Sequence, residues 1–263
     1  MIPELFKIGP ITLHSFGLMA MLGFLIPSLI MRGEFRRNKI DPDFASTIAV
    51  AAIIGGFIGA RLYYIIEHWQ DFLRDPVSMI FSGAGLVWYG GFFGGAAAVI
   101  YIIKRNKLPV LSTVDLIAPL LMLGYAFGRG GCLLSGDGDY GPPSDLPWAM
   151  AFPKGIVPTA VPVHPTPIYN ILLTMIFFAI IWKVRMRNFP SGTIFGMCLI
   201  AGGVERFVTE FWRNTPKLAF GWMTLAQIFS VILILIGSYI IIEARKHSLS
   251  PMPARAMKTK QSA

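Results

Sequence analysis

The chain has 263 residues, of which 54% are hydrophobic and only 14% are charged, with a formal net charge of +9. Because charged residues make up about 25% of a typical soluble domain, this composition excludes an ordinary soluble protein and indicates a polytopic membrane protein. The positive charge does not indicate a nucleic-acid partner, since Lys and Arg lie in short clusters between apolar stretches. The two cysteines, Cys132 and Cys198, are too few for a disulfide framework, so we expect no redox or structural metal role.

Apolar stretches near the length of about 20 residues that crosses a bilayer recur along the chain. The fourth stretch is short and the sixth carries charged residues, so we expect both to line the protein interior. The predicted fold class is an all-α polytopic membrane protein of about seven transmembrane helices. These helices are predicted at residues 13–31, 44–66, 86–103, 114–127, 166–182, 192–212 and 222–242.

The largest interruption between these stretches is the segment 128–165, which is rich in Pro, Gly and Asp. Loops of that length in a compact protein are usually functional. We expect one transmembrane catalytic domain over residues 1–247, with this segment as a small head, and a basic tail at 248–263 near anionic lipid. A shorter segment, 67–85, predicts a short amphipathic helix at the membrane interface.

Basic residues cluster after the first, third, fifth and seventh stretches, for example at Arg36, Lys104, Arg185 and Arg245. The positive-inside rule predicts that those segments are cytoplasmic. The amino terminus and the head are then outside and the carboxyl terminus is inside. The first stretch has no basic region before it and no small-residue cleavage site, so we expect it to be retained as a helix.

Glycines recur at helical spacing within the second and third stretches, as Gly55 with Gly59 and Gly90 with Gly94. Such pairs allow two helix backbones to approach closely. We predict that these two helices pack against each other, with close approach of a lipid ligand as the alternative.

The sequence GRGGCLLSGDGDYG at 128–141 joins the fourth stretch to the head. Arg129 lies at this junction, and an ionisable residue near bilayer depth is a functional candidate because it is costly to keep there. A snorkelling arginine beside a polar loop is the alternative. The GDGDYG part also resembles a calcium loop, but Trp148 stands where the final acidic ligand is expected, so no metal site is predicted.

A second group of charged residues lies in the sixth stretch. Arg206 and Glu210 are one helical turn apart, and Arg213 follows Glu210 by three residues, so the three side chains can form one charged ladder. The ladder could consist of ion pairs that only hold helices together. Arg206 lies on the same predicted side of the membrane as Arg129, however, and two guanidinium groups from different helices suit a lipid phosphate.

Sequence motifs then extend over nearly the whole chain. They are GRGGCLLSGDGDYG, DLPWAMAFP, VHPTPIY, LHSFGLM, GARLYY, VWYGGFFGG, VDLIAPLLMLGYAFGR and ERFVTEFWR. Together they resemble the signature of the bacterial prolipoprotein diacylglyceryl transferase family. The resemblance implies a multi-pass enzyme of the bacterial inner membrane with a periplasmic head. It also implies transfer of the diacylglyceryl group of phosphatidylglycerol to the lipobox cysteine of a prolipoprotein, which leaves a thioether and releases glycerol phosphate, without a cofactor.

The resemblance also implies roles for individual residues. Arg129 matches the arginine of the family signature and Arg206 that of the sixth-helix motif, so both are assigned to the phosphate. Glu210 is expected to orient Arg206. Asp137 is the expected counterpart of the signature glutamate, with Asp139 as a rival, and either would help to deprotonate or position the incoming peptide.

Two more residues, His164 and Tyr169, match the family's outer motif before the fifth helix. Both are expected to contribute to substrate binding, although a lone histidine at the start of a helix is more often a structural hydrogen-bonding residue. His14 is expected near the substrate as well.

The chain departs from the family pattern at several neutral hydrogen-bonding positions. Tyr89 stands where a histidine is often proposed as the base for the thiol, and a phenol with a pKa near 10 is a poor base but a competent donor to phosphate. Cys132 replaces the signature asparagine, and Phe16 and Gly202 replace tyrosines. Phosphate binding is therefore better supported than the base. The candidate bases are His14, Asp137, Asp139 and Glu210.

Three alternatives stay open. Cys132 could accept the lipid covalently, although a buried cysteine is more often an apolar filler. The protein could be a divergent paralogue that uses another acceptor or another anionic lipid. It could also be a lipid or anion transporter, although no internal repeat of the kind found in many transporters is present.

Overall fold

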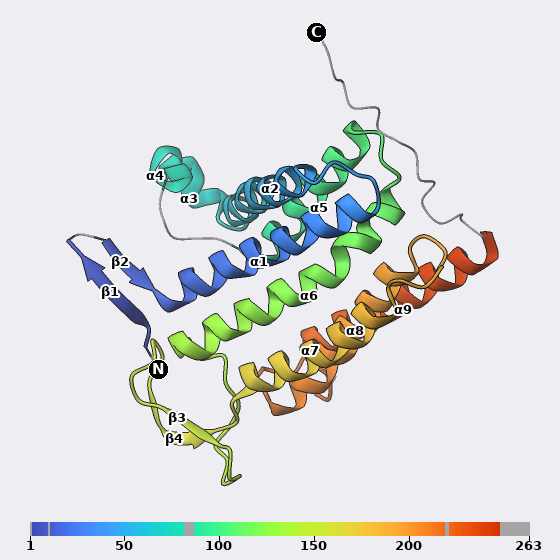
Figure 1. The fold of residues 1–263 in the computed structure, drawn as a ribbon. Coiled ribbons are helices and arrows are strands. Elements are labelled where there is room, and N and C mark those ends of the chain that lie inside the picture. The colour runs from blue at the N-terminus through green and yellow to red at the C-terminus, as the bar shows by residue number, and fades with distance from the viewer. Residues whose placement is uncertain (1, 10, 82–86, 219–220, 248–263) are drawn as a thin grey trace. The chain divides into compact units, whose positions relative to one another are not determined.

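The structure is a computed structural model that describes residues 2–9, 11–81, 87–218 and 221–247. It contains helices at all seven predicted positions and two small antiparallel hairpins, one before the first of these helices and one between the fourth and the fifth (Figure 1). The chain divides into two compact units. Of the described residues, the first unit comprises those up to residue 30 and from residue 114 onward, and the second comprises those within 31–113. The predicted basic tail at 248–263 lies outside the described residues. The all-α fold class predicted from the sequence is confirmed.

In the first unit, the helices α6, α7, α8 and α9 run side by side (Figure 1). An apolar cluster joins three of them through Ala118 and Met122 of α6, Ile181 of α7 and Ile194 and Cys198 of α8. The helices of this unit are α1 (Ser15–Arg37, as far as residue 30), α6 (Val110–Ser135, from residue 114), α7 (Thr166–Val184), α8 (Thr193–Thr209), the 3-10 helix η1 (Glu210–Trp212) and α9 (Leu225–His247).

The start of α8 is fixed by a carboxylate from another helix. Both oxygens of Asp115 in α6 accept backbone N–H groups, from Gly192 at 2.6 Å and from Phe195 at 2.7 Å. Helix N-termini carry unpaired N–H groups and a partial positive charge, so an acidic group there satisfies donors and favours the dipole. This contact sets where α8 begins and therefore where its charged end lies.

The second unit is built on close packing of α2 (Phe44–Glu67) against α5 (Trp88–Arg105). A Cβ added at Gly59 would lie 2.3 Å from the carbonyl oxygen of Gly90, and one added at Gly94 would lie 2.3 Å from that of Gly55. The predicted packing of these two helices through their glycines is confirmed. Between them in the sequence are the short helices α3 (Trp69–Arg74) and α4 (Pro76–Phe81), which lie within the segment 67–85 where an amphipathic helix is predicted. Residues 82–85 of that segment lie outside the described residues, and its location at the membrane interface stays a prediction.

Among the described residues, five helices are long and apolar enough to cross a membrane: α1, α2, α6, α7 and α9. The helix α5 contains four glycines and ends in two basic residues, and α8 is only 17 residues long and contains Glu205 and Arg206. The protein is therefore a multi-pass membrane protein, and the total of seven crossings stays a prediction.

The predicted start of the head at residue 128 is wrong, because α6 continues to Ser135. Gly130 and Gly131 lie inside this helix, where an added Cβ would lie 2.6 Å from Met19 Cε and 3.0 Å from Phe16 Cδ2 of α1. In an apolar environment a helix satisfies its own backbone groups, so these glycines serve close packing rather than a loop.

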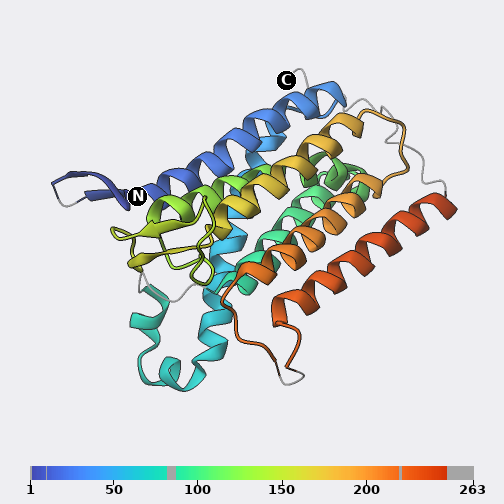
Figure 2. The same cartoon turned by 90° about the horizontal axis from the view of Figure 1, so that it is seen from below.

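The head proper begins after α6 and leads into α7 (Figure 2). It contains the strands β3 (Met150–Phe152) and β4 (Thr159–Val163), paired antiparallel. A second hairpin, β1 (Glu4–Ile8) with β2 (Ile11–His14), precedes α1. The first helix therefore starts at Ser15, two residues after the predicted position.

Candidate active site

Arg129 lies in the last third of α6, with 19% of its side chain exposed. Its guanidinium lies over the ring of Tyr125, 5.0 Å from the ring centre, and Nη1 contacts the sulfur of Cys132 at 3.9 Å. Nη1 also forms an ion pair with Asp139. A guanidinium this little exposed is tolerated because an aromatic face and a carboxylate both contact it.

The charged end of α8 forms the predicted ladder, which is confirmed. Arg206 Nη2 lies 2.8 Å from Glu210 Oε2, and Arg213 Nε lies 3.7 Å from the same oxygen. Glu210 opens η1, and its side chain is fully buried. One buried carboxylate therefore holds two guanidinium groups on one side of the helix end.

Asp139 links this ladder to α6. One of its oxygens contacts Arg129 and the other contacts Arg213. The backbone around it is held as well, because its carbonyl accepts the hydroxyl of Thr166 at 2.7 Å and its N–H donates to Asp137 Oδ1 at 3.2 Å. Of the two acids considered from the sequence, Asp139 is the one that lies between arginines, while Asp137 supports the turn.

A second buried carboxylate, Glu205, lies behind the arginines. Asn170 of α7 donates to Glu205 at 2.5 Å and to the hydroxyl of Thr209 at 2.9 Å, and all three residues are at most 3% exposed. Electrostatic interactions connect Glu205 to both Arg129 and Arg206. The sequence analysis gave Glu205 no role in the site, although it is a carboxylate directly before Arg206. It also missed Asn170, an amide directly after Tyr169.

The cluster holds three guanidinium groups in ion pairs with Asp139 and Glu210, and both donors and acceptors are left over. Arg206 Nη1, Arg213 Nη1 and both side-chain oxygens of Glu210 are buried without a hydrogen-bond partner among the described residues. Burial, followed by repulsion from Arg129, lowers the pKa of Arg213, as expected for cations held close together. Buried donors without an acceptor are costly, so this geometry suits an additional anion.

His164 and Tyr169 meet at the base of the head. His164 Nδ1 lies 3.1 Å from the hydroxyl of Tyr169, which also accepts the indole N–H of Trp148 at 2.9 Å. The ring of Tyr169 packs edge-on against Trp212, which belongs to η1 beside the ladder. These two predicted residues therefore contact the arginine cluster only indirectly, through the packing of Tyr169 against Trp212.

Two other predicted residues lie elsewhere. His14 ends β2, is exposed, and is paired in register with Glu4 of β1. Tyr89 lies in the first turn of α5, in the second unit, so its part in a site with the arginines stays a prediction. Within the residues that the structure describes, no group of three or more His, Cys, Asp or Glu side chains could hold a metal ion.

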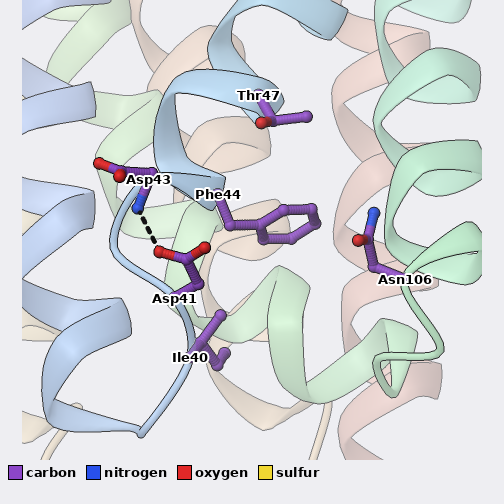
Figure 3. Close-up of a pocket in the computed structure, with 6 residues that line it drawn as sticks. All are labelled: Ile40, Asp41, Asp43, Phe44, Thr47 and Asn106. Atoms are coloured by element: carbon purple, nitrogen blue, oxygen red, sulfur yellow. Dashed lines mark hydrogen bonds between the residues drawn. The ribbon is translucent and has the colours of Figure 1, made fainter. Parts of the chain in front are cut away.

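A separate pocket of about 200 Å³ lies in the second unit (Figure 3). The Phe44 ring extends between Asp41 and Asn106, and the Asp43 N–H donates to Asp41 at 3.0 Å. Its charged lining residues are both acidic, so it is unsuited to a phosphate. The arginine cluster of the first unit is the better candidate for an anionic substrate.

The fold and this cluster define a multi-pass membrane protein with a buried, arginine-rich site. Comparison with known proteins gives its family. A family model described as prolipoprotein diacylglyceryl transferase matches residues 3–243. The chain belongs to this family and is a transferase.

Relatives named phosphatidylglycerol--prolipoprotein diacylglyceryl transferase are similar along almost their full length. The one from Clostridium tetani is 31% identical, covering 90% of this chain and 96% of its own. One from Pseudomonas putida strain F1 is also 31% identical, covering 96% and 97%. A Clostridium perfringens relative with the same name and the number 2 is 33% identical, covering 91% and 94%.

Proposed function

We propose that the protein transfers the diacylglyceryl group of phosphatidylglycerol to the thiol of the lipobox cysteine in a prolipoprotein. The observation that carries this proposal is the cluster of Arg129, Arg206 and Arg213, in which two guanidinium groups keep buried donors without a partner. The family match and the names of the relatives agree with a phosphate-bearing lipid substrate.

The reaction forms a carbon–sulfur bond and breaks a carbon–oxygen bond. The thiolate attacks the glycerol carbon that carries the phosphodiester, and glycerol phosphate leaves with one more negative charge than it had as a diester. Cations that contact the phosphate stabilise that charge as it develops, in a site where little water competes. Arg129 and Arg206 are proposed to perform this role, with Glu210 orienting Arg206 from 2.8 Å.

The thiol must also lose its proton, since the thiolate is the nucleophile. Asp137, Asp139 and Glu210 are proposed proton acceptors in the cluster, and His14 is proposed from the sequence. Tyr89 is proposed to donate a hydrogen bond to a phosphate oxygen. His164 and Tyr169 are proposed to support the peptide side of the site, through their contacts with Trp148 and Trp212.

We also propose that the protein lies in the bacterial inner membrane, with its amino terminus and head in the periplasm and its carboxyl terminus in the cytoplasm. The positions of the basic clusters support this orientation. The acceptors would then be prolipoproteins whose lipobox cysteine reaches the outer face of the membrane.

The direct test uses purified protein, phosphatidylglycerol and a lipobox peptide. Mass spectrometry should show one diacylglyceryl group added to the peptide cysteine, and Arg129→Ala and Arg206→Ala should lose this activity. Arg74→Ala is the matched control, because Arg74 is 79% exposed and pairs only with Asp71 among the ion pairs of the described residues. Unchanged turnover in both arginine variants of the cluster would remove their proposed roles.

Two outcomes would favour the other functions. Lipid binding without transfer to any lipobox peptide would favour a paralogue with another acceptor. Movement of phosphatidylglycerol between the leaflets of vesicles, without product, would favour a transporter.

A further inference from the structure

We propose that the Asp139 carboxylate is an internal stand-in for the substrate phosphate. It joins Arg129 to Arg213, and an incoming phosphate displaces it, so that Arg213 becomes a third cation of the phosphate site. This inference rests on the proposed function and deepens it by naming the group that the lipid must replace.

Each oxygen of Asp139 contacts a different guanidinium, one from α6 and one from the segment that follows η1. A carboxylate in this position presents two acceptor oxygens and one negative charge. The two non-bridging oxygens of a phosphodiester present the same charge and acceptors, and guanidinium groups bind both kinds of anion in a similar way.

The cluster also holds two buried donors that Asp139 does not satisfy. The Nη1 atoms of Arg206 and Arg213 are buried and have no hydrogen-bond partner among the described residues. Both residues contact the same oxygen of Glu210 through other nitrogen atoms, at 2.8 and 3.7 Å, and both oxygens of Glu210 also have no hydrogen-bond partner among the described residues. A phosphate has more acceptor oxygens than a carboxylate and could serve these donors together with those that Asp139 now occupies.

The charges in the cluster also favour displacement over simple addition. Asp139 and Glu210 form ion pairs with the three guanidinium groups, and Glu205 and Asp137 interact with them electrostatically. A phosphate that entered beside all of these carboxylates would be a buried negative charge without compensation, and displacement of one carboxylate lowers that excess.

Asp139 is the carboxylate that can leave. Glu205 and Glu210 are each 3% exposed and belong to α8 and η1. Asp139 lies outside any helix, directly after Gly138, whose φ is +92°. Its side chain can therefore turn away as the surrounding turn opens, which would also release its N–H from Asp137.

Binding measurements on purified protein in phosphatidylcholine nanodiscs test the proposal. The probes are phosphatidylglycerol added to the nanodisc, glycerol phosphate and inorganic phosphate. Asp139→Asn should tighten phosphatidylglycerol binding about tenfold, because a competing anion is removed, and Arg213→Ala should weaken it about tenfold, each about 1.4 kcal/mol.

The surface pair Arg32 and Asp43, 2.9 Å apart, supplies matched controls, because Arg32→Ala and Asp43→Asn remove the same groups from an exposed site. These control variants should bind all three probes as the parent does. Weaker or unchanged lipid binding in Asp139→Asn would overturn the displacement, and unchanged binding in Arg213→Ala would overturn the third cation. Tight binding of the two soluble anions without binding of phosphatidylglycerol would overturn the assignment to a lipid headgroup.

Hydrogen exchange on the parent protein gives a second readout that needs no variant. Phosphatidylglycerol should raise exchange in residues 136–141 relative to phosphatidylcholine alone, and unchanged exchange would contradict the displacement. The transfer assay is run on the same preparation. If the protein transfers the diacylglyceryl group but the variants do not change lipid binding, only the displacement of Asp139 is wrong. If the variants change lipid binding as expected but no transfer occurs, only the proposed reaction is wrong.

Discussion

The α2–α5 pair and the α6–α7–α8 group are both packed in the apolar part of the chain, but through opposite chemistry. In the pair, Gly59 and Gly90 bring two backbones so close that an added Cβ on either would lie 2.3 Å from the other's carbonyl oxygen. In the group, an apolar cluster gives way toward one end to Asn170, Glu205 and Arg129, which are buried or nearly so.

The two regions therefore have different expected roles: the α2–α5 pair stabilises the fold, and the arginine cluster is the candidate site for chemistry. Lipid tails are as apolar as the helix surfaces, so the hydrophobic effect does little to drive helices together in a membrane. Close backbone contact between small residues is therefore a main source of packing energy. Charged groups in the same environment are costly, and they are kept where they have a function. Changes in the glycine pair should therefore affect folding first, and changes in the arginine cluster should affect activity first.

The largest effect is expected from Arg206→Ala. It removes a cation that we propose contacts the phosphate, and the loss of one such electrostatic contact lowers kcat about 10²–10³-fold, or about 2.7–4 kcal/mol. Transfer to a lipobox peptide and thermal unfolding in detergent would be measured together. If the variant lost activity only because it unfolded at lower temperature, the arginine cluster would serve stability rather than activity, contrary to the proposal.

The next effect is expected from Gly59→Ala, because the new methyl group meets backbone atoms of α5 that cannot move without separating the helices. Overpacking of this kind costs about 1–3 kcal/mol. The unfolding temperature in detergent should fall, and the transfer rate per folded molecule should fall less than in Arg206→Ala. An unchanged unfolding temperature would show that the two helices do not depend on this contact.

A smaller effect is expected from Asn170→Ala, which leaves Glu205 and Thr209 without their shared donor. Loss of a buried hydrogen-bond partner costs about 1–3 kcal/mol, and part of that cost can be relieved by Arg129 and Arg206. We expect moderate losses in both unfolding temperature and kcat. Asn170→Asp tests whether the lost donor is the cause. A second carboxylate beside Glu205 should lower the unfolding temperature and kcat more than alanine does.

The smallest effect is expected from Gly33→Ala in α1, the matched control for Gly59→Ala. A Cβ at Gly33 meets nothing within 4 Å, so the methyl group adds no clash. Alanine is favoured over glycine inside a helix by about 0.5–1 kcal/mol. The unfolding temperature should stay the same or rise slightly, and a clear fall would mean that glycine itself, rather than its close contacts, explains the result at Gly59.

Sequence reasoning performed differently in the two regions. Spacing alone identified Gly55, Gly59, Gly90 and Gly94 as a packing interface, because helical periodicity places such residues on one face. It also predicted the Arg206–Glu210–Arg213 ladder, whose members are neighbours on one helix end. It missed the end of α6, because glycine inside an apolar helix resembles the start of a loop.

The amino-acid sequence by itself determined the membrane class, the positions of the helices and the local charged ladder, since these depend on composition and on contacts between residues close in the chain. Only the tertiary structure decided that Asp139, rather than Asp137, lies between Arg129 and Arg213, and that Asn170 holds Glu205. Those contacts join residues up to 74 positions apart. Their geometry depends on where the helices α6, α7 and α8 end against one another, which no local pattern specifies.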